Sequence, residues 1–117
     1  MKYILLLRQD PSLAPAEGTP EADADMQQWG ALYGELSSSG ALVSGTGLES
    51  EEAATTLRTR DGAPLITDGP FAETKEMLFS FFVLNADDLD EALAWAKKMP
   101  CAQYGSVEVR PLSIHSQ

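Results

Sequence analysis

Residues 78–100, LFSFFVLNADDLDEALAWAKKMP, contain both kinds of secondary structure from which the fold is built. The first part, 78–85, is the most apolar segment of the chain, and this pattern is typical of a central β-strand. Asp88, with Glu91 three residues later, favours a helix start, and Pro100 ends that helix. The stretch therefore predicts a strand followed directly by a helix. The buried face predicted for this helix consists of Leu89, Ala92, Leu93 and Ala96.

The same two elements are predicted at the start of the chain. Residues 2–8 are short and apolar, as expected of a buried strand. A helix is expected to begin at Thr19-Pro20, because threonine is a good N-cap and proline suits the first turn, and to end at Gly40. Its apolar residues recur at steps of three and four, which is the period of one helical face. These residues are Met26, Trp29, Leu32, Tyr33 and Leu36.

Three further strands follow from local patterns. Residues 41–46 form a second strand that Gly45 and Gly47 are expected to interrupt, and 106–112 alternate as a half-buried last strand does. Two β-rich runs, 54–60 and 64–67, flank Asp61-Gly62, which is a strong hairpin signal. The segments without a period are predicted to lie outside the core. They are the acidic, Pro- and Ala-rich loop 10–22, the charged turn 49–53, the loop 68–77 and the tail 113–117.

The order of elements, β-α-β, hairpin, β-α-β, predicts one α+β domain of the ferredoxin-like type over residues 1–117. In this fold both helices cover one face of an antiparallel sheet, and the other face stays bare. Neighbouring strand residues alternate sides, so part of Phe79, Phe81, Phe82 and Val83 must point to the bare face. An apolar face of this size is usually covered by a second chain. We therefore expect a homodimer, sheet against sheet.

Composition excludes several classes of function. Lys and Arg number 8 and Asp and Glu 18, giving a net charge of −10, which disfavours both nucleic acid and anionic membrane surfaces as partners. No apolar run approaches the ~20 residues of a membrane-spanning helix. The single cysteine, Cys101, excludes an internal disulfide and favours a cytoplasmic protein. No cofactor motif and no zinc-ligand spacing is present, and Cys101 is interpreted as a small buried filler.

The turn Asp68-Gly69-Pro70-Phe71 is the first candidate site. Pro70 restricts Gly69, and Asp68 is placed to cap backbone N–H groups two or three residues on. As a structural element this is a rigid turn with Phe71 plugging the core. As a functional element it holds Asp68 at the mouth of a pocket.

Charged residues follow this turn. If residues 73–76 are helical, Glu73 and Glu76 share a face and Lys75 lies to the side. Two acids and a base beside an aromatic ring suit a small polar or cationic ligand, and the two carboxylates can share a proton. If the protein is an enzyme, the carboxylates of Asp68 and Glu73 are the catalytic candidates for proton transfer. The alternative is a solvated charged turn or a salt bridge in the dimer with Arg58 or Arg60. Magnesium or calcium on Asp68, Glu73 and Glu76 would bind only weakly.

Two other residues complete the set of candidates for a ligand pocket. Trp29 is interpreted as core against the sheet, or as an aromatic wall of the pocket. Arg58 lies on the predicted hairpin after a span, 9–57, that holds nine acids and no base. It is interpreted as part of a solvated hairpin face, of an anion site or of a contact between subunits.

The motif DGPFAETKE at 68–76 resembles the DGPF subgroup of the YCII-related proteins. The opening MKYILLL and the phrases GALVSGTGLES at 40–50, ADDLDEALAWA at 86–96 and GSVEVRPL at 105–112 are similar as well. The resemblance implies a dimeric α/β barrel and an association with extracytoplasmic-function sigma factors. Related proteins pair a first-helix histidine with an acid. Trp29 stands at that position here, so no acid–base pair is carried over.

Three functions remain open at this point. The first is a small dimeric ligand-binding or regulatory protein in a sigma-factor system. The second is a small enzyme that uses pocket carboxylates for proton transfer, which rests on analogy with other proteins of this fold. The third is a structural interaction module whose acidic face is the partner surface.

Overall fold

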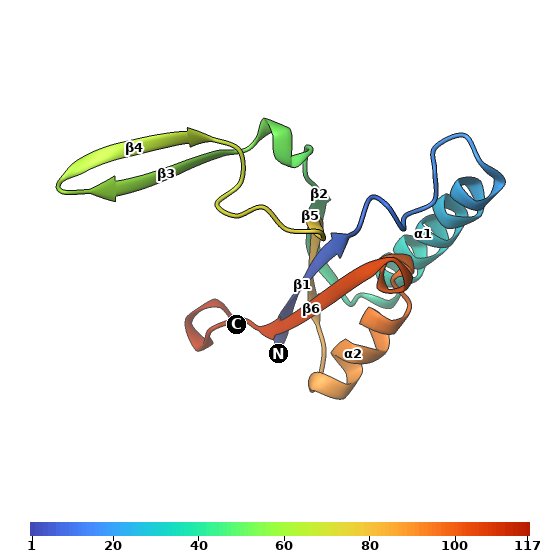
Figure 1. Cartoon of the computed structure of the whole chain (residues 1–117). Helices are drawn as coiled ribbons and strands as arrows, with labels where there is room; N and C mark the ends of the chain where they lie inside the picture. The colour runs from blue at the N-terminus through green and yellow to red at the C-terminus, as the bar shows by residue number, and fades with distance from the viewer.

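The computed structural model describes residues 1–117 and contains the elements that the sequence predicts, in the predicted order (Figure 1). Six strands, two α-helices and three short 3₁₀ helices follow one another along the chain. The strands are β1 (Lys2–Gln9), β2 (Leu42–Gly47), β3 (Thr55–Arg60), β4 (Ala63–Asp68), β5 (Met77–Asn85) and β6 (Gly105–Pro111). The helices are α1 (Pro20–Ser39) and α2 (Leu89–Lys97), with 3₁₀ turns at Glu51–Ala53, Pro100–Gln103 and Ile114–Ser116.

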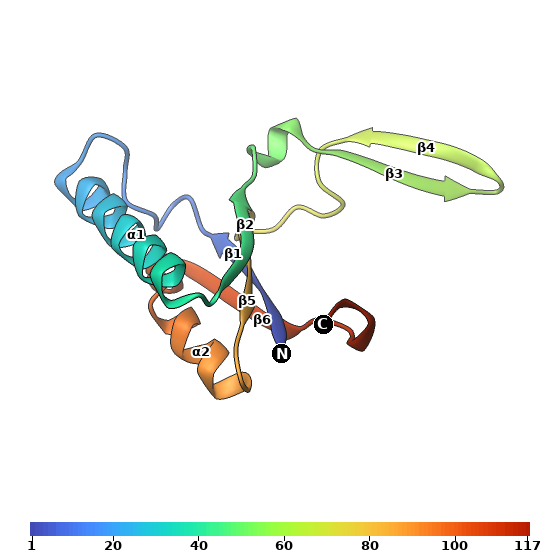
Figure 2. The ribbon, with the colours of Figure 1, turned by 180° about the vertical axis from the view of Figure 1, so that it is seen from behind.

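Four of the strands form one sheet in the order β2-β5-β1-β6, and every neighbouring pair is antiparallel. This is the strand order of a ferredoxin-like fold, and the mixed α+β architecture is confirmed. Both helices lie on one side of the sheet in Figures 1 and 2. The other side of the sheet, here called the bare face, is covered by no helix of this chain.

The bare face carries only part of the aromatic cluster. Phe81 and Val83 are half-buried on it, whereas Phe82 belongs to the core under the helices. Phe79 also packs toward the helices, because the register of β5 against β1 shifts at Leu7/Arg8 and breaks the alternation. Of the four residues proposed for the bare face, Phe79 and Phe82 therefore lie on the opposite side.

The caps of α1 are confirmed, but its buried face is narrower than predicted. The Thr19 hydroxyl accepts a hydrogen bond from the backbone N–H of Ala22 at 3.2 Å, and Gly40 ends the helix with φ 78°. Leu32 and Leu36 are buried. Met26 and Tyr33 are 71% and 55% exposed, so their assignment to the core was wrong. The N-terminal half of α1 projects beyond the sheet (Figure 1), so less of the helix lies on the sheet than the apolar pattern predicts.

The buried face of helix α2 is also narrower than the sequence predicts. Asp88 caps it by accepting the Glu91 N–H at 2.9 Å, as predicted. Ala92 and Ala96 are buried against the sheet, and their small side chains let the helix lie close to it. Leu89 and Leu93, also predicted to be buried, are instead exposed. The hydrophobic core as a whole is built around β1 and β5. It contains Tyr3, Leu5, Leu7, Leu32, Leu36, Phe82, Leu84, Ala86, Ala92, Ala96, Met99, Cys101 and Tyr104.

Strand β2 continues through Gly45, which was expected to interrupt it, and ends at Gly47. Gly45 lies against Phe82, and a Cβ there would meet the Phe82 ring at 2.5 Å and the Phe81 carbonyl oxygen at 2.8 Å. The glycine is therefore required by the packing of β5, and it does not mark the end of a strand.

The hairpin of β3 and β4 projects away from the rest of the molecule. Asp61 and Gly62 form its turn with φ values of 53° and 77°, as the sequence predicts. The hairpin extends on the side of the sheet opposite to the helices (Figures 1 and 2). The radius of gyration is 16.2 Å, whereas roughly 13 Å is usual for a chain of this length. The chain leaves the sheet after β2 and returns to it at β5, and these two points are joined by a hydrogen bond from the Leu48 N–H to the Phe79 carbonyl at 2.8 Å.

Candidate functional site

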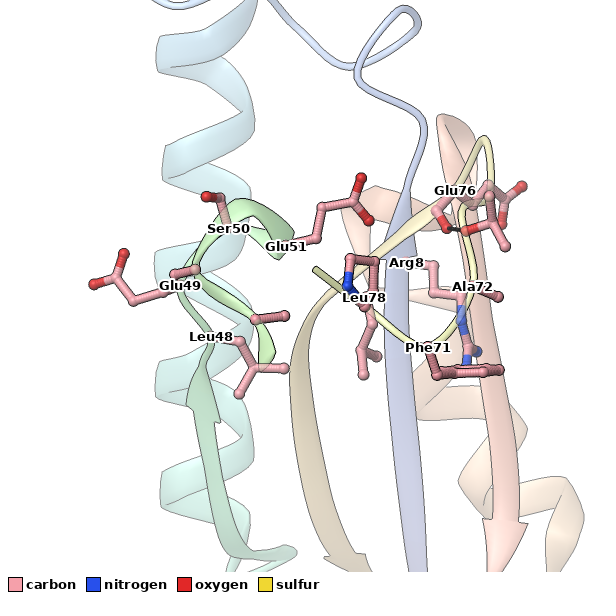
Figure 3. Close-up of a pocket in the computed structure, with 13 residues that line it drawn as sticks. Arg8, Leu48, Glu49, Ser50, Glu51, Phe71, Ala72, Glu76 and Leu78 are labelled. Carbon is pink, nitrogen blue, oxygen red and sulfur yellow. Dashed lines mark hydrogen bonds between the residues drawn. The ribbon is translucent and has the colours of Figure 1, made fainter. Parts of the chain in front are cut away.

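A pocket of about 470 Å³ lies at the foot of the hairpin, where the segment after β2 faces the segment before β5 (Figure 3). Two residues of the bare face, Arg8 and Leu78, form its floor. The pocket therefore opens on the side of the sheet that the helices leave uncovered. It is lined by Arg8, Leu48, Glu49, Ser50, Glu51, Ala53, Ala54, Pro70, Phe71, Ala72, Thr74, Glu76 and Leu78.

Much of the pocket wall is apolar. The Phe71 side chain is 79% exposed, and Leu48 and Leu78 are also exposed. Apolar side chains gathered around a concavity are the usual lining of small-molecule sites, where a few polar groups fix the orientation of the ligand. The wall can therefore hold the hydrophobic body of a ligand.

Carboxylates supply most of the charge around the pocket. Glu51 and Glu76 are half-buried, and Glu76 accepts a hydrogen bond from the Ser106 hydroxyl. Glu49 is turned away from the other labelled side chains (Figure 3). The one cation, Arg8, donates to Glu108 at 2.8 Å. Arg110 and Arg8 together lower the pKa of the Glu108 carboxyl, which keeps this partner of Arg8 ionised.

The loop that carries Phe71 is fixed to β3 through its backbone. The Gly69 N–H donates to the Ala54 carbonyl at 2.7 Å, and the Thr56 hydroxyl donates to the Gly69 carbonyl at 2.8 Å. The Arg58 guanidinium donates to the Phe71 carbonyl at 3.1 Å. Gly69 has φ 98°, a conformation that residues with a side chain rarely adopt. These bonds hold the Phe71 ring at the pocket wall.

Three of the residues predicted for a ligand pocket line this one, namely Pro70, Phe71 and Glu76. Arg58 and Gly69 do not line it but hold the loop. Asp68, Glu73, Lys75 and Trp29 lie outside the lining.

The two catalytic candidates, Asp68 and Glu73, do not line the pocket. Asp68 ends β4, exposed to solvent, and its carboxylate makes no hydrogen bond, so the predicted capping contact is not formed. Residues 73–76 form no helical turn, which removes the shared face expected for Glu73 and Glu76. Within the chain, Glu73 forms no salt bridge with the hairpin arginines. Phe71 does not plug the core, because it is exposed at the pocket.

Trp29 packs on the far side of the sheet from the pocket. Its ring meets Phe79 edge-on, with centroids 6.2 Å apart, and its indole N–H donates to the Tyr104 hydroxyl at 3.4 Å. This placement agrees with its interpretation as core, and it is not a wall of the pocket.

Sequence reasoning missed ten of the 13 lining residues, among them Arg8, Leu48, Glu51 and Leu78. Arg8 and Leu78 were assigned only to strands, and Glu51 to a solvated turn. Their proximity depends on the pairing of β2 with β5, which brings the chain before and after the hairpin together. No local pattern signals this arrangement. The alternation along β1 places Arg8 on the bare face, and that was the one available hint.

No three His, Cys, Asp or Glu side chains converge as a metal site would require. Neither helix has the length and apolar character needed to span a bilayer.

A solved structure shares the fold. It is the 5-chloro-2-hydroxyhydroquinone dehydrochlorinase (TftG) from Burkholderia phenoliruptrix AC1100, in complex with 2,5-dihydroxybenzoquinone. The two chains align with a TM-score of 0.51 at 14% identity, over 97% of this chain and 94% of the other. At this identity the likeness shows the fold alone.

The sequence comparisons cover almost the whole chain. An uncharacterized protein of Rhizobium meliloti (strain 1021) is 37% identical over 117 residues, which are 98% of this chain and 94% of that protein. The model of the YCII-related domain matches residues 1–114. The fold, the extent of this match and the relative together show that the chain belongs to the YCII-related domain family.

Proposed function

We propose that the chain is a small dimeric ligand-binding protein and that its ligand has an apolar, preferably aromatic, body and a cationic head. The pocket at the foot of the hairpin carries this proposal. Phe71, Leu48 and Leu78 offer the apolar contact, while Glu51 and Glu76 offer negative charge beside it. Arg8 adds little repulsion, because Glu108 compensates its charge. A cation near both carboxylates and an aromatic ring is the best match to these groups.

The proposal is tested with two probes that share a ring and differ in their heads, 2-phenylethylammonium and 3-phenylpropionate. Calorimetry should show that the cation binds more tightly. Glu76→Gln should weaken the binding of the cation by about threefold to fivefold, since a partly exposed ion pair contributes up to ~1 kcal/mol. Phe71→Ala should weaken both probes. Glu73→Gln is the matched control, because Glu73 lies on the same loop outside the lining and should have no effect. Equal binding of the two probes would refute the cationic head.

The dimer is part of the proposal. The half-buried apolar residues of the bare face, Ile4, Leu6, Phe81 and Val83, are the surface through which two sheets would pack into a dimeric α/β barrel. Sedimentation at micromolar concentration should show a dimer, and Leu6→Glu should give a monomer. A wild-type protein that sediments only as a monomer would contradict this part.

The second candidate function is an enzyme of proton transfer. It is favoured by the Glu76 carboxylate, which is half-buried in the pocket and oriented by Ser106. The structural neighbour is named as a dehydrochlorinase, and its fold is shared. Release of chloride from 5-chloro-2-hydroxyhydroquinone, lost in Glu76→Gln and kept in Glu73→Gln, would support this function over simple binding.

A regulatory role with an extracytoplasmic-function sigma factor, which the DGPFAETKE motif implies by resemblance, would add a protein partner to the ligand. Exposed apolar side chains on the hairpin, Leu57 and Ile66, are available for such a contact. Copurification with a sigma factor from the same bacterium, reduced by Ile66→Asp, is the corresponding test.

A further inference from the structure

The chain contains two Asp-Gly dipeptides, Asp61-Gly62 and Asp68-Gly69, which lie at the two ends of strand β4. An aspartate followed by glycine isomerises more easily than other aspartates, because glycine has no side chain to shield its backbone nitrogen. The nitrogen attacks Cγ of the aspartyl carboxyl, water leaves, and a five-membered succinimide ring forms. Since the two dipeptides are chemically alike, a difference in their rates in the folded chain would reflect the structure around them.

Asp61-Gly62 is free to react. Both residues are exposed in the turn between β3 and β4, which is the tip of the hairpin, far from the sheet and the helices (Figure 1). The Asp61 carboxylate forms no ion pair, and the Gly62 N–H donates to no group of the chain. Asp61 has φ 53°, a strained conformation for a residue with a side chain. Such a tip opens locally at little cost in free energy, and opening brings the Gly62 nitrogen within reach of Cγ.

Asp68-Gly69, in contrast, is held in place. The Gly69 N–H donates to the Ala54 carbonyl at 2.7 Å, and the Gly69 carbonyl accepts from the Thr56 hydroxyl at 2.8 Å. Gly69 is also half-buried, whereas Gly62 is exposed. Attack by the Gly69 nitrogen would require the nitrogen to leave Ala54 and turn toward the Asp68 carboxyl. The structure therefore protects this dipeptide.

We propose that Asp61 is a site of spontaneous modification, at which the folded chain converts aspartate to isoaspartate. Water adds to the succinimide at the former main-chain carbonyl of Asp61, so the link to Gly62 then runs through the side-chain carbon Cγ. The water lost in the first step is regained in the second, and no other reactant is consumed. The product has a free α-carboxylate. A carboxyl methyltransferase that recognises isoaspartate transfers a methyl group to it from S-adenosylmethionine, so the tip makes the chain a substrate for such a repair enzyme.

This modification changes the hairpin. The turn has two residues, and Arg60 pairs with Ala63 across it. Isoaspartate adds the Cβ carbon to the main chain, and the register of a hairpin is set by the type and length of its turn. The pairing next to the turn is therefore lost in the modified chain. Arg58, which donates to the Phe71 carbonyl at 3.1 Å, lies two residues before Arg60, so the change reaches the contact that holds the pocket loop. The inference goes beyond the proposed function and does not depend on its ligand.

The test compares the two dipeptides within one protein. The purified chain is kept at neutral pH for several weeks, once folded and once in urea. Asp-N endoproteinase cleaves before aspartate but not before isoaspartate, so the loss of cleavage before residue 61 or residue 68 measures each conversion. In the folded chain we expect Asp61 to convert at least about tenfold faster than Asp68, because hydrogen bonds hold Gly69 on both sides. In urea this difference should disappear.

Methylation is the second measurement. A purified isoaspartyl carboxyl methyltransferase with S-adenosylmethionine should methylate the incubated folded chain. Asp61→Glu should abolish most of this methylation, because glutamate would have to form a six-membered ring and cyclises far more slowly. Asp68→Glu makes the same change at the other end of β4 and should be methylated as much as the wild type. Equal conversion of the two aspartates in the folded chain, or faster conversion of Asp68, would overturn the inference. So would a folded chain that stays unmodified while the chain in urea is converted.

Trypsin measures the effect on the hairpin. The peptide bond after Arg58 lies inside the paired strand β3, and proteases cut backbone that is exposed and unpaired. The chain with isoaspartate at position 61 should be cut there at least about fivefold faster than the unmodified chain, since the strand opens more readily. Cleavage after Lys97, which lies in α2, should be equal in the two forms. Equal cleavage after Arg58 as well would refute the loss of pairing.

Discussion

The hydroxyl of Tyr104 donates a hydrogen bond to the carboxylate of Asp25 at 2.9 Å, which ties the start of β6 to the first half of α1. The same hydroxyl accepts from the Trp29 indole. Tyr104 is 8% exposed, so these bonds lie at the edge of the core. They anchor the one part of α1 that projects beyond the sheet.

Removal of this hydroxyl should destabilise the fold. Tyr104→Phe is expected to lower the free energy of unfolding by about 1–2 kcal/mol, because it takes a donor from a carboxylate and an acceptor from an indole. Urea unfolding followed by circular dichroism measures the change. Tyr33→Phe is the control, because Tyr33 is exposed and makes no hydrogen bond, and it should be close to neutral. Equal effects of the two substitutions would contradict the role of Tyr104.

The raised pKa of Tyr104 predicts that the protein loses stability at high pH. Burial, with the Asp25 charge beside it, raises the pKa of Tyr104 from 10.0 to about 12. A raised pKa stabilises the folded state while the phenol is protonated in both states, and this contribution is lost as the pH rises from 10.0 through about 12. Urea unfolding across this range should show a decline that is smaller in Tyr104→Phe. A decline of the same size in both proteins would contradict the assignment.

Cys101 should be unreactive in the folded protein. Burial raises its pKa to about 12, and the side chain is fully buried. The thiolate is the reactive form, so both access and ionisation are suppressed. Ellman's reagent at neutral pH should label the native protein slowly and the urea-unfolded protein at once, with one thiol per chain. Rapid labelling of the native state would show that this side of the core opens readily.

Two glycines of β2 should differ sharply when replaced by alanine. A Cβ at Gly45 would meet the Phe82 ring at 2.5 Å, whereas at Gly47 the nearest atom is 3.9 Å away. Gly45→Ala is expected to cost about 1–3 kcal/mol, the usual cost of overpacking a core. Gly47→Ala should change stability by less than about 0.5 kcal/mol. Thermal unfolding of the two variants side by side would measure the difference, and a neutral Gly45→Ala would refute the close contact.

Replacement of Asp88 and of Asp68 should have different effects on stability. Asp88 caps α2, and Asp88→Ala should cost about 1 kcal/mol. Asp68 makes no hydrogen bond, so Asp68→Ala and Asp68→Asn should both stay within about 0.5 kcal/mol of the wild type. Denaturant unfolding of the three variants checks this. A loss in Asp68→Ala that is as large as that in Asp88→Ala would restore the capping role expected from the sequence.

The elements could be predicted from sequence because their signals are local. Local signals act on the backbone within a few residues. Thr19 and Asp88 begin helices, Gly40 ends one, and Asp61-Gly62 turns the hairpin, each where it was expected to. The alternation of strand residues was a weaker guide. It holds along β1 and fails at Phe79, where the register shift moves the ring to the helix side.

The pocket could be predicted only in part, because its two walls come from chain segments that meet through the sheet. The unusual turn at Gly69 drew attention to Phe71 and Glu76, which do line the pocket. It also drew attention to Asp68, whose carboxylate has no partner. Glu51 and Arg8 carry no such local mark, because their role depends on the pairing of β2 with β5 and on which face of β1 is bare.

The hydrogen bond between Leu48 and Phe79 lies at the boundary between two parts of the molecule. The sheet with its two helices is here called the scaffold, and the segment between β2 and β5 is called the cassette. Strands β2 and β5 are neighbours in the sheet, so the span from 49 to 76 is the loop of one long hairpin whose ends the sheet already holds together. The entropy of closing such a loop grows only slowly, by about 0.6 kcal/mol for each doubling of its length. The scaffold is therefore nearly indifferent to what the cassette contains. An engineer could exchange the cassette for another binding loop at little cost to the core.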